Sequence, residues 1–144
     1  MLGRKLIVVG EGPERPRLQA MAGDGVQLAG RLPDREIADL YARCRAFLFP
    51  GLDDFGIAPV EAQAAGRPVI AYGAGGALET VVDGVTGVHF AEQTPAAVAG
   101  AMERLDALPI DPAACRANAE QFDTAQFRAR IRAALEETVR NAGA

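Results

Sequence analysis

The chain is poor in the residues that mark several common functional classes. It has no tryptophan, one histidine (His89) and two cysteines (Cys44 and Cys115) among 144 residues. Three such residues make a structural zinc site implausible, and we expect no metal. Cys44 continues the apolar face of a predicted helix, so we expect a reduced, buried thiol. His89 lies in a predicted strand, with no acidic or nucleophilic partner at a diagnostic spacing, and is interpreted as a strand residue rather than a catalytic base.

Long apolar runs and an excess of positive charge are also missing. No run approaches the ~18 apolar residues of a membrane span. The first apolar run, near the start of the chain, is too short for a signal peptide and ends in a glycine turn. The net charge of −4 argues against a nucleic-acid-binding surface. We therefore expect a cytoplasmic protein without a nucleic-acid partner.

What the sequence does contain is a regular alternation of short apolar strands and amphipathic helices. Its length predicts a single domain over residues 1–144, and 49% apolar residues are enough for one core. Strands are predicted at residues 5–9, 26–29, 46–49, 69–72 and 88–90. The run at 5–9 is continuously apolar after Lys5, which is typical of a strand buried on both faces of a parallel sheet. The pattern predicts an α/β fold, a Rossmann-like parallel sheet with helices on both faces.

The end of the chain predicts helices. Thr94-Pro95 and Asp111-Pro112 are helix starts, each a capping residue followed by proline. A long amphipathic helix is predicted over about 124–141, with Phe127, Ile131, Leu135 and Val139 spaced by four and arginines on its other faces. Packing against the domain is the commoner fate of such a helix, and binding to a membrane surface is the alternative.

The stretch from Phe49 to Glu79 is the most informative part of the sequence. A predicted strand ends at Phe49 and leads into a turn with two carboxylates, Asp53 and Asp54. Gly56 permits close approach of the backbone, and Pro59 suits the first position of a helix, which would place Glu61 in the first turn. A strand, a loop and a helix N-terminus in this order bind phosphates in parallel α/β folds.

Two further turns follow predicted strands and should open on the same edge of the sheet. Gly10 and Gly12 form a Gly-x-Gly turn after the first strand, which could direct backbone N–H groups at a phosphate or could be a plain tight turn. Arg31 and Leu32 follow the second strand. Ligands of parallel α/β folds bind beyond the carboxyl ends of the strands, so both turns lie at the edge where a ligand would bind. From the residues alone, Arg31 and Leu32 could equally be a solvated arginine and a core leucine.

Three consecutive stretches carry a resemblance: Asp53, seven intervening residues and Glu61; then Ala-x-Ala-x-Gly-x-Pro-Val-Ile-Ala; then Gly-Gly-x-x-Glu-x-Val. Together they resemble the donor-binding signature of retaining family-four glycosyltransferases, also called glycosyl transferases group 1. The family usually has glutamate where this sequence has Asp53, and the aspartate side chain is one methylene shorter than that of glutamate. The segment Phe-Pro-Gly-x-x-Asp-Phe-Gly-Ile is most similar to that of bacterial mannosyltransferases of surface-polysaccharide synthesis. The resemblance implies one half of a GT-B fold.

The resemblance also assigns roles. Asp53 would hold hexose hydroxyls, Glu61 the ribose hydroxyls, and the backbone around Gly56 the pyrophosphate. It adds Gly10 and Gly12 as donor-facing residues, and Arg31 and Leu32 as contacts of the base. The loop residues around the hexose are Asp54, Phe55, Gly56, Ile57 and Ala58. The implied substrate is a nucleoside-diphosphate sugar such as GDP-mannose, without a cofactor or metal.

Complete enzymes of this family also have an N-terminal acceptor-binding half, and their donor half begins with a further strand–helix unit. Neither matches this sequence, so we expect a truncated donor-binding domain that transfers little or no sugar alone and needs the missing half as a partner. The full enzyme could also contact a membrane peripherally. Two alternatives stay open: a non-catalytic nucleotide-binding or regulatory module, and an inactive remnant.

Overall fold

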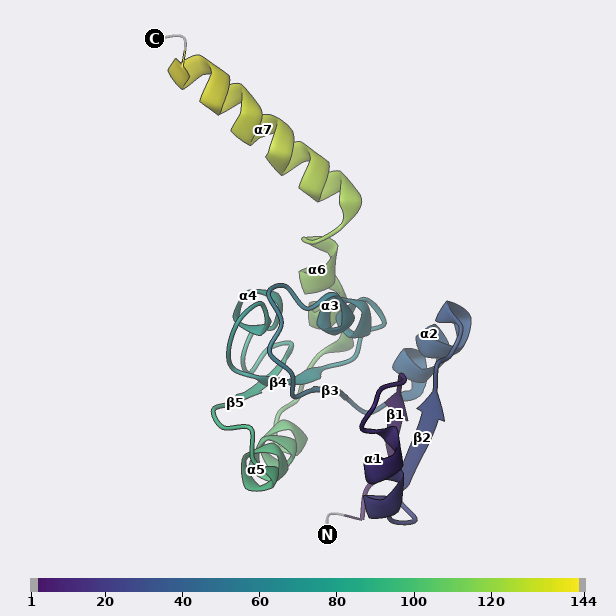
Figure 1. Ribbon diagram of the computed structural model, residues 1–144. Helices are drawn as coiled ribbons and strands as arrows, with labels where there is room; N and C mark the ends of the chain where they lie inside the picture. Colours follow the sequence, from purple (N-terminus) through teal and green to yellow (C-terminus); the bar gives the residue numbers. More distant parts are fainter. Residues whose placement is uncertain (1–2, 143–144) are drawn as a thin grey trace. The chain divides into compact units, whose positions relative to one another are not determined.

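The computed structural model describes residues 3–142, and the chain divides into two compact units (Figure 1). The first unit ends at Arg43 and the second begins at Cys44. Every strand pairing between named strands is parallel, and helices alternate with strands in both units. The predicted α/β class is therefore confirmed. The sequence did not indicate that the strands would be divided between a two-stranded and a three-stranded sheet.

The first unit is a strand–helix–strand–helix segment. Its elements are β1 (Leu6–Val9), α1 (Arg15–Met21), β2 (Val26–Gly30) and α2 (Asp34–Arg43). β1 pairs with β2 so that Leu6 lies opposite Val26 and Val8 opposite Leu28, and the register then shifts so that Val9 faces Gly30. The carboxyl ends of both strands thus meet at one edge, where the two predicted turns follow.

The prediction that the first strand is buried on both faces is wrong. Leu6, Ile7 and Val9 of β1 keep 41%, 43% and 38% of their surface exposed. β1 is bonded to one neighbouring strand, β2, and α1 has no buried residue with which to cover it. A segment of this size cannot bury a strand on both sides by itself, because small units bury a small share of their surface.

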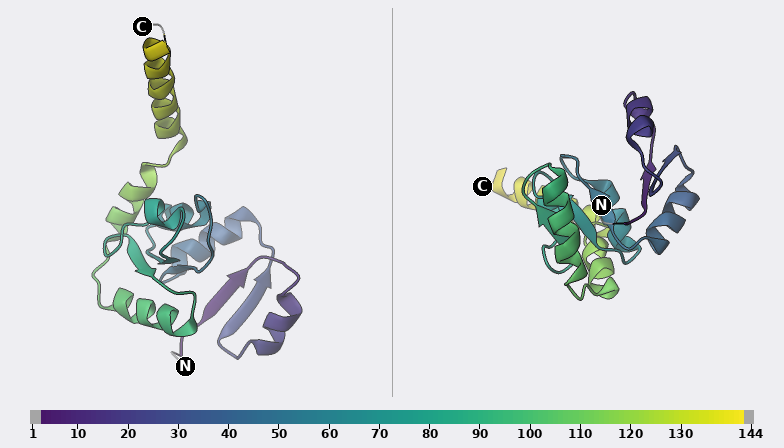
Figure 2. Two further views of the ribbon diagram at one scale, coloured as in Figure 1. Left: turned by 60° about the vertical axis from the view of Figure 1, so that its left-hand side comes forward. Right: turned by 90° about the horizontal axis from the view of Figure 1, so that it is seen from below.

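The second unit has a three-stranded sheet in the order β3-β4-β5. Its elements are β3 (Phe47–Phe49), α3 (Ile57–Ala64), β4 (Val69–Tyr72), α4 (Ala77–Thr80), β5 (Gly87–Phe90), α5 (Pro95–Asp106), α6 (Pro112–Glu120) and α7 (Thr124–Ala142). In this unit α5 covers one face of the sheet, and α3 lies on the opposite face with α6 beside it (Figures 1 and 2). The central strand β4 is buried over Val69–Ala71, as expected for a parallel strand covered on both sides.

The core of the second unit lies between the sheet and α5. Its buried members are Ile70, Val88, Phe90, Ala101 and Leu105. Val98 and Met102 pack against this cluster, so the apolar face predicted for α5 is the face that it buries. The predicted helix starts are confirmed, since the Thr94 side chain accepts a hydrogen bond from the Ala97 N–H and Asp111 accepts one from the Ala113 N–H.

The two cysteines differ in their surroundings. Cys115 is fully buried, and burial raises the pKa of its thiol. Cys44, predicted to be a core thiol, is only half-buried, although burial also raises its pKa. Both are free thiols, and the raised pKa values keep them protonated and unreactive near neutral pH.

The long helix predicted at the end of the chain is present as α7, 19 residues long. Asp123 caps its start, since the Asp123 carboxylate accepts a hydrogen bond from the Gln126 N–H at 2.7 Å. The four apolar residues of its stripe stay between 47% and 71% exposed: Phe127, Ile131, Leu135 and Val139. The predicted packing of this face against the domain is therefore not what the structure shows.

Candidate nucleotide-sugar site

The loop after β3 is organised by Asp53. One oxygen of its carboxylate, Oδ1, accepts hydrogen bonds from the N–H groups of Phe55 and Gly56, both at 3.1 Å. Asp53 and Asp54 are both exposed, as is the side chain of Ile57. The first predicted hexose-binding carboxylate therefore also fixes the turn that leads into α3, a structural role that the sequence motif does not reveal.

The start of α3 differs from the predicted one. Gly56, in a left-handed conformation with φ of +80°, immediately precedes the helix, which begins at Ile57 rather than Pro59. Pro59 is the third residue, where its missing N–H costs nothing because the first four N–H groups of a helix have no intrahelical acceptor. Glu61 consequently lies in the second turn and not in the first, so the prediction that it occupies the first turn is wrong.

Because α3 begins at Ile57, its first backbone N–H groups lie where the loop after β3 ends. By helix geometry the N–H groups of Ile57 and Ala58 lack intrahelical partners, and the positive end of the helix dipole lies behind them. Gly56 is buried against Phe49 and Pro59, while Glu61 is exposed one turn further along the same helix. The helix N-terminus, with its N–H groups that lack intrahelical partners, suits an anionic diphosphate. The exposed carboxylates beside it suit hydroxyl groups that flank the diphosphate.

The glycine-rich loop between β4 and α4 lies directly against the loop after β3. The Gly76 N–H donates to the Asp53 carbonyl oxygen at 2.9 Å. A Cβ atom at Gly76 would collide with the Phe55 backbone, and one at Gly75, whose φ is +59°, would meet the Asp53 carbonyl oxygen. The run of glycines between β4 and α4 is thus required for the close approach of the two loops at the carboxyl edge of the sheet.

A buried polar network holds α3 in place behind this loop. The Gln63 amide is fully buried and donates to the carbonyl oxygens of Pro59 (3.1 Å) and Thr80 (2.8 Å). Asn118 of α6 donates to the Gln63 side-chain oxygen (2.7 Å) and also to the Thr80 carbonyl (2.9 Å). The Thr80 hydroxyl in turn donates to the Gly76 carbonyl at 2.9 Å. The network therefore ties α3, α4 and α6 to the glycine loop.

These positioning residues were missed in the sequence. Gln63 sits in the alanine-rich segment Glu-Ala-Gln-Ala-Ala, where a single amide on an apolar helix face was the available signal. Nothing in the sequence connects it with Asn118, 55 positions away. Burial makes such amides costly unless every partner is present, so the network specifies one arrangement of the three helices.

In the first unit the candidate residues also gather at one edge. The Gly10 N–H donates to the Gly30 carbonyl at 2.7 Å, which brings the Gly10–Gly12 turn beside the loop that carries Arg31 and Leu32. Arg31 is exposed and Leu32 half-buried. Sequence reasoning overlooked Arg15, which pairs with Glu11 at 2.9 Å and donates to the Leu28 carbonyl, placing a cation at this edge.

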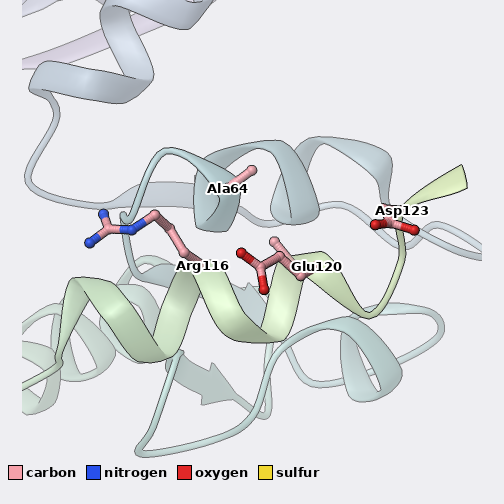
Figure 3. Close-up of a pocket in the computed structure, with 5 residues that line it drawn as sticks. Ala64, Arg116, Glu120 and Asp123 are labelled. Carbon is pink, nitrogen blue, oxygen red and sulfur yellow. The ribbon is translucent and has the colours of Figure 1, made fainter. Parts of the chain in front are cut away.

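A pocket of about 220 Å³ lies elsewhere in the second unit, beside α6 (Figure 3). It is lined by Ala64, Arg116, Ala119, Glu120 and Asp123, none of which belongs to the predicted site. The described residues contain no group of three or more histidine, cysteine, aspartate or glutamate side chains that could hold a metal ion. Over the same part of the chain no helix is both long enough and apolar enough to cross a membrane.

The family model of "Glycosyl transferases group 1" matches residues 3–122, which include every candidate site residue. The chain belongs to this family. Among curated relatives, this chain is 40% identical over 99 residues to a GDP-mannose-dependent alpha-mannosyltransferase of Corynebacterium glutamicum. The match covers 65% of this chain and 24% of the relative. It is 37% identical to D-inositol 3-phosphate glycosyltransferase of Frankia alni, over 67% of this chain and 25% of the relative. The chain thus spans about a quarter of the length of these relatives.

Solved GT-B glycosyltransferases share the fold. Anabaena HepE in complex with UDP-glucose is 26% identical to this chain, with a TM-score of 0.71 over 92% of this chain and 41% of HepE. The galactosyltransferase WaaB of the lipopolysaccharide outer core gives a TM-score of 0.78 at 17% identity, which shows likeness of fold alone. The expectation of a GT-B type of donor domain from the motif is therefore confirmed.

Proposed function

We propose that this chain is the nucleotide-sugar-binding portion of a retaining hexosyltransferase, with a GDP-mannose-like donor. The observation that carries the proposal is the arrangement around Gly56, where exposed carboxylates flank the N-terminus of α3. The N–H groups of Ile57 and Ala58 would hold the pyrophosphate, which is the leaving group of glycosyl transfer. Mannose is favoured because GDP-mannose-dependent mannosyltransferases are among the relatives at 40% identity.

The carboxylates would bind the ribose and the hexose of the donor. Glu61, exposed one turn into α3, would accept hydrogen bonds from the ribose hydroxyls. Asp53 has one oxygen occupied by the loop N–H groups, so its second oxygen, Oδ2, would accept from the hexose. Asp54 and Phe55 would complete the loop around the hexose, while Arg31 and Leu32 stay predicted contacts of the base. The reaction would need neither metal nor cofactor.

Transfer itself would need more than this chain. The match covers only about a quarter of the length of the relatives, and we propose that an acceptor-binding half supplies the second substrate. The chain alone would bind the donor and transfer little sugar. Assembly of a surface polysaccharide and a cytoplasmic location, both expected from the sequence, belong to the same proposal.

Calorimetric titration of the chain with GDP, UDP, GDP-mannose and UDP-glucose tests the donor site. We expect one base to be preferred and Glu61→Gln to weaken binding by roughly 10- to 100-fold, since hydrogen bonds to a charged group contribute about 1.5–3 kcal/mol. Asp53→Asn keeps the Oδ1 acceptor of the loop and should weaken only the hexose conjugates. Glu120→Gln, beside the pocket on α6, is the matched control and should bind normally.

The result that overturns the proposal is a folded chain that binds none of these nucleotides at millimolar concentration. That outcome would favour the inactive remnant. Binding of nucleotides without any preference for the sugar conjugates, and with no effect of Asp53→Asn, would instead favour a nucleotide-binding module without transfer chemistry.

A further inference from the structure

The short connection between α6 and α7 contacts the donor loop, residues 50–56 between β3 and α3, through an aromatic pair. The ring of Phe122, in this connection, meets the ring of Phe55 edge to face, with centroids 5.7 Å apart and ring planes at 72°. Aromatic rings favour this geometry, because the positive edge of one ring lies against the negative face of the other. Phe122 is half-buried, whereas Phe55 keeps 42% of its surface exposed. Phe122 therefore supplies part of the cover that the Phe55 ring has.

Phe55 is tied into the turn that presents the candidate ligand groups. Its N–H and that of Gly56 donate to the same Asp53 carboxylate oxygen, both at 3.1 Å. Its backbone also lies so close to Gly76 that a Cβ atom there would collide with it. A displacement of Phe55 would therefore move the backbone between Asp53 and the first turn of α3.

The end of α6 fixes Phe122 from the other side. The Phe122 N–H donates to the Ala119 carbonyl oxygen at 3.0 Å. One turn before Phe122, the buried Asn118 amide donates to the Gln63 side chain at 2.7 Å and to the Thr80 carbonyl at 2.9 Å. The ring is thus attached to the network that holds α3 and α4. It can serve as a fixed support for a loop whose own side chains are largely exposed.

We propose that Phe122 is a positioning residue of the donor site, which acts through Phe55. The ring pair holds the turn from Asp53 to Gly56 so that the Asp53 carboxylate and the first N–H groups of α3 face a nucleoside-diphosphate sugar. This role rests on the proposed function, and Phe122 lies outside the sequence motif. An aromatic pair contributes a factor of about threefold to tenfold beyond the burial of its area. Loss of either ring should shift the loop towards open arrangements by that factor.

A side chain that only fills space would behave differently. Loss of packing at such a residue lowers the free energy of unfolding of the whole unit without opening one loop in particular. Leu108 offers the matched control, since it is also half-buried in the second unit but packs against the core cluster beside α5. Leu108→Ala should lower the midpoint of urea unfolding and leave the donor loop unchanged. Phe122→Leu should open the loop while the chain stays folded.

Hydrogen exchange of the Phe55 and Gly56 amides, followed by NMR of the ¹⁵N-labelled chain without ligand, tests the hold on the loop. Both hydrogens are bonded to Asp53, so their exchange requires opening of the turn. We expect exchange about three to ten times faster in Phe122→Leu, unchanged in Leu108→Ala, and at the wild-type rate in Phe122→Tyr, which keeps the ring. Circular dichroism checks that each variant is folded. Equal rates in Phe122→Leu and the wild type, or equal acceleration in Leu108→Ala, would overturn the proposal.

Calorimetric titration of the same variants with GDP-mannose tests the consequence for the donor. Phe122→Leu should weaken binding by about threefold to tenfold, and Phe122→Tyr should bind like the wild type. Phe55→Leu/Phe122→Leu should bind no more weakly than Phe55→Leu, because the ring pair is already absent in the single variant. Additive losses would overturn the action through Phe55. A wild-type chain that binds no nucleotide contradicts the proposed function instead, and the exchange rates then decide by themselves whether Phe122 holds the loop.

Discussion

Replacing Gln63 by alanine should destabilise the second unit substantially. The substitution removes two hydrogen bonds that the amide donates, to Pro59 and Thr80, and one that it accepts from Asn118. At about 0.5–1.5 kcal/mol for each buried hydrogen bond, together with the cavity left by a fully buried side chain, we expect a loss of about 3 kcal/mol. Asn118→Ala should cost a similar amount, because it removes the other end of the same network.

Tyrosine fluorescence provides a clean assay, since the chain has no tryptophan and two tyrosines. In a Tyr41→Phe background the signal of urea unfolding comes from Tyr72 in β4, within the second unit. Gln93→Ala is the control: its amide donates a single exposed hydrogen bond, to Pro50, and should cost under about 1 kcal/mol. The double variant Gln63→Ala/Asn118→Ala should cost less than the sum of the single changes by about 0.5–3 kcal/mol. Additive losses, or a loss below about 1 kcal/mol for Gln63→Ala, would refute the network's role.

Two further predictions concern the loops. Gly76→Ala should distort the contact with Phe55 and abolish nucleotide binding, whereas Gly51→Ala, whose Cβ meets no atom within 4 Å, should bind normally in the same titration. Burial alone would raise the Asp83 pKa, but the His89 N–H and the Arg104 guanidinium outweigh it and hold that pKa below its usual 3.8. The stabilisation is therefore present above pH 3.8 and lost as the pH falls through the folded-state pKa. Asp83→Asn should flatten this acid loss, by under about 1 kcal/mol because Asp83 is largely exposed, and an unchanged acid limb in urea unfolding would contradict the assignment.

The parts of the fold that depend on local chemistry could be predicted from the sequence. Thr94-Pro95 and Asp111-Pro112 begin helices because the capping side chain and the proline act within one turn. The face of α5 that carries Ala101 and Leu105 is buried because its period matches the helix. In the same way, the alternation of short apolar runs with helices was sufficient for a parallel α/β fold.

The parts that depend on contacts between distant residues could not be predicted. Pro59 suggested the helix start, but the left-handed backbone at Gly56 begins α3 two residues earlier and moves Glu61 out of the first turn. The β-branched run of β1 predicted burial, yet burial depends on neighbours that the run does not encode. The pairing of Gln63 with Asn118 joins two helices that the sequence separates by 55 positions.

The most direct test of the donor site is to locate the bound nucleotide on the backbone. Amide resonances of the ¹⁵N-labelled chain are followed while GDP-mannose is added. The account predicts that the largest shifts belong to Gly56, Ile57 and Ala58 at the start of α3, with smaller changes at Gly75 and Gly76. Shifts confined to Arg116, Glu120 and Asp123, which line the pocket on α6, would show that the ligand binds elsewhere and would contradict the central claim.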